Sequence, residues 1–219
     1  MKNKWSNKRI QKFFQTNRNS VNDVYLGEKI LLENFLRNGS TVLDIGCGYG
    51  GFYNILKKMK KRINYTGIDF NEDMIINAKK KYPKSNFKYY AGSNYKNFLK
   101  KKYDYVIIFG VLHLNLNWRK ILINAKEISK KGLLFDLRTH KGPSIENINK
   151  SYFKLGDSEK FDIIPYNIIN KSKLDNFFQK VFKNYSLFKI SYDGKPSQFS
   201  STPISKVSFE NFFLKKNKS

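Results

Sequence analysis

The residues with the clearest chemical content lie between positions 42 and 51, where an apolar stretch runs into a glycine cluster. The stretch Val42–Ile45 contains one acid, Asp44. Four glycines follow it: Gly46, Gly48, Gly50 and Gly51. A strand that ends in a glycine-rich turn before a helix lets the backbone approach a ligand closely and points helix N–H groups at that ligand. The pattern therefore predicts a ligand-binding loop.

The glycines fit two motifs that share Gly46 and Gly48 and differ in the third glycine. With Gly51 they match G-x-G-x-x-G, the fingerprint of dinucleotide-binding folds. With Gly50 they equally match D-x-G-x-G-x-G, which begins at Asp44. The spacing of the glycines alone does not separate these two registers.

Two acids favour the register that begins at Asp44. A dinucleotide fold needs no carboxylate inside this strand, and an unpaired buried carboxylate is costly, so a ligand with a cationic amino-acid end would supply its partner. Asp69 closes a second apolar strand, Tyr65–Asp69. An acid at this end of the strand could hold a ribose diol by two hydrogen bonds. The alternative for Asp69 is a simple helix N-cap, a position that aspartate favours.

The elements that must position these residues alternate between strand and helix. Strands are predicted at residues 41–45, 65–69, 87–91, 103–109 and 133–137, with helical segments at 52–59, 72–81, 94–99 and 118–129 between them. Such alternation indicates a parallel sheet with crossover helices. A helix at 24–36 precedes this unit, and a helix at 174–182 and strands at 185–192 and 207–214 follow it. We expect an α/β, Rossmann-like doubly wound, mostly parallel seven-stranded sheet with an antiparallel C-terminal strand pair.

The domain organisation follows from the same reading. Residues 1–40 are expected to form an N-terminal helical segment that could close over a cofactor as a lid, and residues 41–219 to form one Rossmann-like domain. Residues 139–165 show little periodicity and contain two glycines and two prolines, so we interpret them as an insertion or lid. No internal repeat and no linker divides the chain.

Composition excludes several classes of protein. With 219 residues, 40% of them hydrophobic, the chain can bury one substantial core and is too apolar for a disordered tail. No run approaches the roughly 18 apolar residues of a membrane span, and the basic start lacks the apolar segment of a secretory signal. The single cysteine, Cys47, excludes a disulfide scaffold and a CxxC-type metal or redox site. We expect a cytoplasmic protein without a resident metal.

The formal net charge of +25 allows two interpretations. Clustered cations bind nucleic-acid phosphates, so RNA is a possible partner of the basic surface. However, only 6 of the 42 basic residues are arginine, the residue that phosphate and base recognition favours. The runs 57–62, 79–81 and 100–102 also fall at the ends of predicted helices, where they complement the helix dipole without a ligand.

Taken in order, these motifs resemble the class I S-adenosylmethionine-dependent methyltransferases. The matching segments are Val42–Gly50, Gly67–Asp69, and Tyr103–Ile107 with Val111–His113. The resemblance covers roughly residues 25 to 138 and implies S-adenosyl-L-methionine as cofactor. It also departs from the family at one point, because the acid that often follows a glycine after the third strand is here Ser93, followed by Asn94.

The resemblance implies roles for individual residues. Gly46, Gly48 and Gly50 would pass under the methionine part of the cofactor, with Asp44 near its amino group and Cys47 inside the loop as a packing residue. Asp69 would hold the ribose hydroxyls. Phe70 or Met74 would flank the adenine, Ser93 or Asn94 would contact its amino group, and Phe109 with Gly110 would line the cleft around the sulfonium.

The acceptor is read from residues 109–115, which follow the fourth strand. The segment lacks the Asn/Asp-Pro-Pro-aromatic motif of enzymes that methylate base amines and the Pro-Cys nucleophile of base C5 enzymes. His113 is the candidate catalytic base, with a packing role as its alternative. Asp136, Arg138 and Tyr25 are expected to face the acceptor at the cleft mouth.

Three functions stay open on the sequence. The first is methylation, by expectation on oxygen, of a small molecule or a glycan precursor, because residues 17–56 resemble methyltransferases associated with surface-polysaccharide synthesis. The second is an RNA methyltransferase that uses the basic surface. The third is a cofactor-binding protein without transferase activity or a dinucleotide enzyme.

Overall fold

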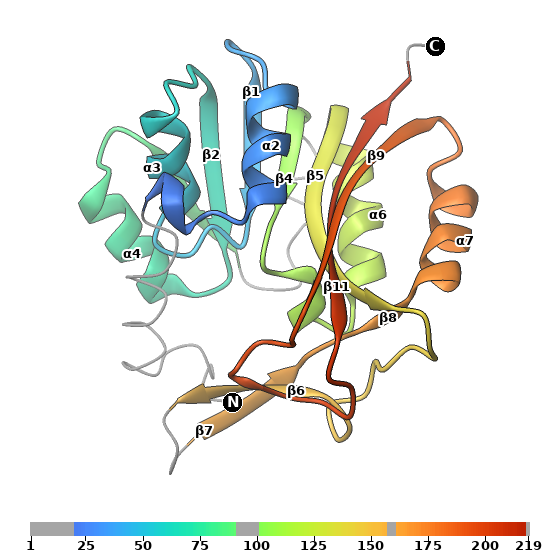
Figure 1. Cartoon of the computed structure of the whole chain (residues 1–219). Coiled ribbons are helices and arrows are strands. Elements are labelled where there is room, and N and C mark those ends of the chain that lie inside the picture. Colours follow the sequence, from blue (N-terminus) through green and yellow to red (C-terminus); the bar gives the residue numbers. More distant parts are fainter. Residues whose placement is uncertain (1–19, 91–100, 157–160, 218–219) are drawn as a thin grey trace.

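The computed structural model describes residues 20–90, 101–156 and 161–217, and its centre is one large sheet (Figure 1). Five strands run parallel to their neighbours: β1 (Thr41–Ile45), β2 (Asn64–Asp69), β3 (Asn86–Tyr89), β4 (Tyr103–Ile108) and β5 (Ser129–His140). Strand β11 (Val207–Lys216) lies antiparallel between β5 and β9 (Tyr185–Gly194), which gives the order β3-β2-β1-β4-β5-β11-β9. A short strand, β8 (Ile169–Asn170), pairs with the end of β5. The expected α/β fold, with its antiparallel C-terminal pair, is confirmed, and β8 makes the sheet eight-stranded where seven strands were predicted.

Helices cover both faces of the sheet. Helices α2 (Leu26–Phe35), α3 (Gly51–Lys58) and α4 (Glu72–Lys81) share one hydrophobic core, and α6 (Trp118–Ile128) and α7 (Lys171–Val181) share another. Successive residues of β4 feed these two cores in turn, since Ile107 belongs to the first and Val106 and Ile108 to the second. Burial on both faces explains the continuous apolar sequence of this strand. No helix in the described ranges is long and apolar enough to cross a membrane.

The start and end of helix α4 show what its flanking residues do. The N-cap is Asn71, whose side chain accepts a hydrogen bond from the backbone N–H of Met74 at 3.2 Å. The alternative that Asp69 is a simple N-cap is therefore wrong. The last turn contains Lys79–Lys81, and the last turn of α3 contains Lys57 and Lys58, so these basic runs do end helices as expected.

A second, three-stranded sheet forms beyond β5, and two of its strands lie within the region expected to be an irregular insertion. Strands β6 (Tyr152–Gly156) and β7 (Phe161–Pro165) form a hairpin, and β10 (Ser200–Ser201) pairs with β6. Figure 1 shows this hairpin below the large sheet, at the end where β5 leads into β8. Phe153, Leu155 and Ile164 form its small core. Alternation over strands of only five residues is too short to give a clear periodic signal.

Candidate active site

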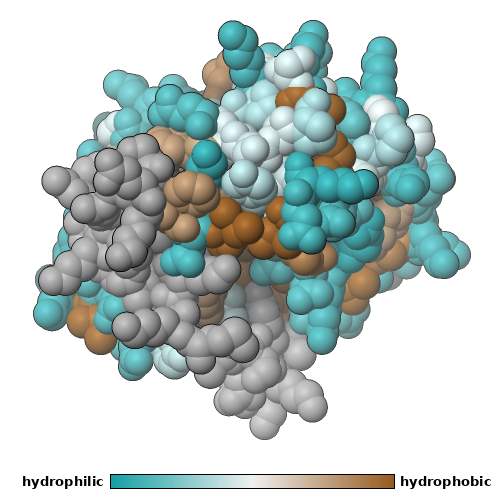
Figure 2. Space-filling model, turned by 90° about the horizontal axis from the view of Figure 1, so that it is seen from below, coloured by the Kyte–Doolittle hydropathy of each residue, from teal (hydrophilic) through white to brown (hydrophobic). Residues whose placement is uncertain are grey.

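A cavity of about 630 Å³ lies at the carboxyl ends of the parallel strands, between the loop after β1 and the small sheet. One end is lined by the glycine-rich loop, and the other by side chains from β5, β9, β11 and the segment after β7. Figure 2, which views this side of the molecule, shows apolar side chains gathered near its middle. The position agrees with the rule that ligands of α/β sheets bind beyond the carboxyl ends of the strands.

The glycine-rich loop presents backbone to the cavity. Gly46, Gly48 and Gly50 have φ values of 78°, 52° and 78°, in the left-handed region that favours glycine. A Cβ on Gly46 would lie 2.4 Å from Cγ2 of Val111, whereas a Cβ on Gly48 would approach only Sδ of Met74, at 3.9 Å. Gly46 is thus fixed by close packing, and Gly48 leaves open space beside the cavity that it lines.

Asp44 lies beneath this loop, outside the cavity lining, and is almost fully buried. The hydroxyl of Tyr65 donates a hydrogen bond to its carboxylate. Burial, together with the negative charge of Asp44, raises the pKa of Tyr65 well above its usual value, which keeps the phenol in its donating form. Asp44 therefore has a partner within the chain, in addition to the ligand expected to pair with it.

Asp69 ties the end of β2 to the glycine-rich loop. Its carboxylate accepts hydrogen bonds from the backbone N–H groups of Gly48, at 3.0 Å, and Asn71, at 2.8 Å. Burial raises the pKa of Asp69 to about 6, although hydrogen bonds from the backbone of Asn71, Gly48 and Phe70 act in the opposite direction. The side chain is 5% exposed, next to the loop that it holds.

The other residues assigned to the cofactor fall in three places. Cys47, Phe109 and Gly110 line the cavity. Met74 is buried under Gly48, and Phe70 is 37% exposed. Ser93 and Asn94 lie outside the described residues.

Cys47 is buried, and burial raises the pKa of its thiol well above the usual value, with the charges of Asp69 and Asp44 acting in the same direction. The thiol is held in its protonated form, which is a poor nucleophile. This environment suits the packing role expected for Cys47.

His113 lies at the opposite end of the cavity, on the short 3₁₀ helix η3 (Leu112–Leu114). Its ring meets the ring of Tyr166 edge-on, with 5.7 Å between centroids, and its Nδ1 lies 3.6 Å from Oδ2 of Asp136. The carbonyl of His113 accepts a hydrogen bond from the backbone N–H of Asn167 at 2.6 Å. These contacts fix the ring at the cavity wall.

Asp136 is buried behind His113 and outside the cavity lining, which corrects the expectation that it faces the cleft mouth. One carboxylate oxygen accepts a hydrogen bond from the backbone N–H of Gly110 at 2.6 Å. The other accepts one from Nη1 of Arg138 at 2.7 Å. Asp136 therefore connects the end of β4, the histidine and the arginine.

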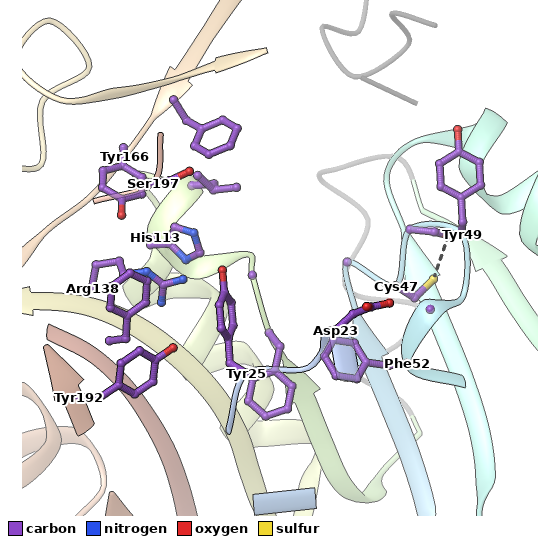
Figure 3. A pocket seen from close by; sticks show the side chains of 18 of the residues that line it. Asp23, Tyr25, Cys47, Tyr49, Phe52, His113, Arg138, Tyr166, Tyr192 and Ser197 are labelled. Carbon is purple, nitrogen blue, oxygen red and sulfur yellow. Dashed lines mark hydrogen bonds between the residues drawn. The ribbon is translucent and has the colours of Figure 1, made fainter. Parts of the chain in front are cut away.

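Arg138 does line the cavity, within a group of aromatic rings (Figure 3). Its guanidinium carbon lies 4.3 Å from the ring centroid of Phe209 and 6.0 Å from that of Tyr25. Tyr192 stacks on Phe209, with centroids 5.1 Å apart and planes within 3°. Burial raises the pKa of Tyr192 to about 12 and also raises that of Tyr166, so both hydroxyls stay neutral near neutral pH.

Several lining residues were missed by the sequence reasoning. They are Tyr166, Tyr192, Lys195, Ser197 and Phe209. These residues come from the segment after β7, from β9 and β11 and from the loop between those strands, which contain no motif. High aromatic content, at 16%, is the only trace of them in the sequence, and it does not say which rings meet.

The geometry fits a nucleotide-type cofactor with an amino-acid end. The glycine-rich loop forms a backbone cradle, and a side chain at Gly48 would occupy the open space beside it. Asp69 stands beside that cradle with both carboxylate oxygens oriented by backbone N–H groups. The opposite end, with His113 and Arg138, leaves a second compartment for another molecule.

Comparison with known proteins agrees with this arrangement. A family model described as "Methyltransferase domain" matches residues 36–181, which include the glycine-rich loop, His113 and Arg138. A solved structure, the 1,6-didemethyltoxoflavin-N1-methyltransferase of Burkholderia thailandensis with S-adenosylhomocysteine bound, superposes with a TM-score of 0.57. It is 14% identical, covers 88% of this chain and 77% of that one, and shows a shared fold.

Two curated relatives have sequence similarity to this chain. "Putative methyltransferase 235L" of Invertebrate iridescent virus 6 is 32% identical over 177 residues, which cover 74% of this chain and 65% of the viral protein. A tRNA (guanine-N(7)-)-methyltransferase of Clostridium botulinum strain Hall is 27% identical over 141 residues, or 58% of this chain and 61% of that protein. The chain thus spans slightly less than two thirds of the length of these relatives.

Proposed function

The chain belongs to the class I S-adenosyl-L-methionine-dependent methyltransferases, and from that premise we propose that it methylates an oxygen of a small molecule or a glycan precursor. The observation that carries the proposal is a histidine, His113, at the wall of a cavity whose other end is the glycine-rich loop. A carboxylate, Asp136, lies behind that histidine. Family membership also sets aside the dinucleotide enzyme as an alternative.

The cofactor would be held by the loop and by the residues around it. The backbone of Gly46 and Gly48 would lie against its methionine part, and Asp69 would accept hydrogen bonds from the ribose hydroxyls. Met74 and Phe70 would flank the adenine. When bound, this cofactor would supply an electrophilic methyl group on a positively charged sulfur, with the neutral thioether as the leaving group once the acceptor atom bonds to the methyl carbon.

His113 would remove the proton of an acceptor hydroxyl. Methyl transfer mostly requires an aligned acceptor, and a base assists when the acceptor is a hydroxyl. Because Nδ1 of His113 faces Asp136, its Nε2 is the nitrogen left for the acceptor. At 3.6 Å from Nδ1, the negative charge of Asp136 would stabilise the imidazolium that forms when Nε2 takes the proton.

An RNA acceptor is the second candidate, favoured by the net charge of +25 and by the similarity to the clostridial tRNA methyltransferase. RNA binding through surface lysines would weaken steeply with added salt because counterions are released. The small acceptor is favoured because His113 lines a cavity of about 630 Å³, with its ring edge-on to Tyr166.

The test is transfer of a labelled methyl group from S-adenosylmethionine to an extract of the source cells, fractionated with and without nuclease. We expect label in a nuclease-resistant small-molecule or glycan fraction. His113→Ala should reduce transfer by about 100-fold or more, the usual contribution of a general base. His140→Ala is the matched control, because His140 contacts the carbonyl of Pro143 and does not line the cavity.

Three results would contradict the proposal in different ways. Label that disappears with nuclease would establish RNA as the acceptor. Full transfer by His113→Ala would remove that residue from the mechanism. Failure of the protein to bind S-adenosylmethionine in calorimetry would remove the methyltransferase activity itself.

A further inference from the structure

The charged side chains that line the two ends of the cavity have opposite signs, and the arginine at the basic end, Arg138, is paired with the buried Asp136 behind the lining. At the glycine-loop end, Asp23 lines the cavity, and Asp44 and Asp69 lie just beneath the loop. At the other end, Arg138 and Lys195 line it. Figure 3 shows Asp23 beside Cys47 and Phe52, across the cavity from Arg138. The acidic end suits a cofactor that carries a sulfonium and an ammonium, and the basic end is complementary to a negatively charged acceptor.

Arg138 has unused hydrogen-bonding capacity at this basic end. Its side chain is 95% buried. The terminal nitrogen Nη1 donates to Asp136 at 2.7 Å and to the backbone carbonyl of Leu137 at 3.4 Å, while Nε has no hydrogen-bond partner among the described residues. A guanidinium has five N–H donors in a fixed fork, and a buried donor without an acceptor is costly. An arginine in this state has donors left for a ligand that reaches it.

We propose that the acceptor carries an oxyanion, either a carboxylate or a phosphate, which Arg138 binds beside the atom to be methylated. This inference rests on the proposed function, because it names the acceptor class for the same cavity. The planar fork of arginine matches the geometry of both kinds of oxyanion, and hydrogen bonds between a guanidinium and an oxyanion are stronger than those between neutral groups. Asp136 contacts both Arg138 and His113, so the oxyanion and the reacting hydroxyl would lie on one compact molecule.

The aromatic residues around Arg138 define the rest of that molecule. Phe209 and Tyr192 form a stacked pair next to the guanidinium, and the Tyr25 ring lies 6.1 Å from that of Phe209. Such rings bind the flat face of an aromatic acceptor or of a sugar. The two oxyanion sources are therefore an aromatic hydroxy-carboxylate and a sugar phosphate.

Matched pairs of probes test the charge preference and separate the two sources. The protein, saturated with S-adenosylhomocysteine, is titrated in a calorimeter with 4-hydroxybenzoate against 4-hydroxybenzyl alcohol, and with glucose 1-phosphate against methyl glucoside. We expect the charged member of at least one pair to bind about tenfold or more tightly than its neutral partner, in keeping with a charged hydrogen bond. The pair that shows the preference identifies the source.

Variants of Arg138 assign the preference to this residue. Arg138→Gln should abolish it, but this change leaves Asp136 buried without its cation and could prevent folding. Arg138→Lys keeps a cation next to Asp136 and removes the fork, so the preference should fall several-fold while the melting temperature changes little. Arg62→Gln, an exposed arginine away from the cavity, is the matched control and should bind the probes like the parent protein.

Equal affinity for the charged and the neutral member of both pairs, or no detectable binding of any probe, would overturn the proposal. A preference that survives in Arg138→Lys and Arg138→Gln would overturn it as well. Binding of S-adenosylhomocysteine is measured in the same titrations. Its presence without a charge preference refutes the oxyanion alone, whereas its absence refutes the proposed function.

Discussion

The two ends of the cavity are built in different ways. The cofactor end is one continuous loop, from Gly46 to Phe52, whose backbone forms the wall. The acceptor end is a set of side chains from segments that are far apart in the sequence: Tyr25, His113, Arg138, Tyr166, Tyr192 and Phe209. The cofactor end depends on the absence of side chains at its glycine positions, and the acceptor end depends on the side chains that distant segments contribute.

The two ends of the cavity are therefore expected to be sensitive to different substitutions. A backbone cradle is damaged by an added Cβ, because Gly46, Gly48 and Gly50 all have left-handed φ values and Gly46 and Gly50 also have close neighbours. A side-chain compartment is damaged by loss of the group that holds its members together, and here that group is Asp136. Three substitutions and one change of pH test this contrast between the backbone cradle and the side-chain compartment.

Removal of the Asp136 carboxylate should have the largest effect. Asp136→Ala leaves the Arg138 guanidinium buried without its partner and the N–H of Gly110 without an acceptor. Breaking one side of a buried ion pair costs about 3–5 kcal/mol of unfolding free energy. Denaturant unfolding followed by circular dichroism measures this loss.

The double variant Asp136→Ala with Arg138→Met is the control for that assignment. If the uncompensated charge causes the loss, removing the guanidinium should restore a large part of the stability. A double variant as unstable as Asp136→Ala would instead assign the loss to the hydrogen bond at Gly110.

A methyl group on Gly46 should have the next largest effect, and it acts on the cofactor end. Gly46→Ala combines a left-handed φ of 78° with a Cβ 2.4 Å from Val111. The first costs about 1–2 kcal/mol and the second about 1–3 kcal/mol, so the loop must shift. We expect the affinity for S-adenosylhomocysteine to fall at least about tenfold in calorimetry, since about 1.4 kcal/mol corresponds to a factor of ten.

Gly39→Ala separates the two contributions, because Gly39 has the same φ of 78° and nothing within 4 Å of its added Cβ. This variant should lose about 1 kcal/mol of stability and bind the cofactor normally. Equal loss of affinity in both variants would show that general destabilisation, rather than the loop, weakens binding.

The sequence predicted the cofactor end of the cavity better than the acceptor end, because the first is one continuous loop and the second is assembled from distant segments. The strands and helices around the glycine-rich loop were predicted because each depends on a local pattern, such as the apolar run of β4 or the glycines after β1. Asp69 lies at the end of β2, as predicted. The N-cap of α4 is Asn71 and not Asp69, and the sequence does not separate them because both residue types are good caps and they lie two positions apart. Local patterns do not distinguish between such neighbours.

The acceptor end was predicted only where it adjoins a predicted strand, as at His113 and Arg138. Tyr166 and Tyr192 reach the cavity because a hairpin and the β9–β11 pair fold against each other, and no local pattern encodes that meeting. The hydrogen bond between Tyr65 and Asp44 was not predicted, because Tyr65 lies on the neighbouring strand. Side-chain pairing across strands requires the register, which the sequence does not display.

The protonation of Asp69 should change cofactor binding by an intermediate amount. Its folded pKa of about 6 lies above the ordinary value, so the folded protein binds more protons than the unfolded chain between about pH 4 and pH 6. The contribution of Asp69 to stability therefore falls as pH rises through this window and stays low above it. Ribose hydroxyls need the ionised carboxylate as acceptor, so cofactor affinity should rise about tenfold from about pH 5 to about pH 7.

Calorimetric titrations with S-adenosylhomocysteine at these pH values measure that rise, and Asp69→Asn is the control. The asparagine cannot ionise, so its affinity should be lower and independent of pH over this range. A pH dependence that persists in Asp69→Asn would assign the proton to another group at the cofactor end.

Replacement of Lys195 should have the smallest effect and sharpens the comparison within the acceptor end. Lys195 lines the cavity and is exposed, whereas Arg138 is buried. Salt screens exposed charges over about 8–10 Å, so Lys195→Gln should weaken binding of the charged probe by about threefold at most at low salt and by nothing measurable at high salt. The matched control is Lys206→Gln, since Lys206 is exposed and pairs with Asp193 at 3.1 Å, outside the cavity lining.

The effect of Arg138→Lys should persist at high salt, because buried pairs are screened much less. If Lys195→Gln instead loses as much affinity as Arg138→Lys, and salt removes both losses, the oxyanion binds at the exposed mouth. The reacting hydroxyl would then extend inward from it to His113, and the acceptor would have to be long rather than compact.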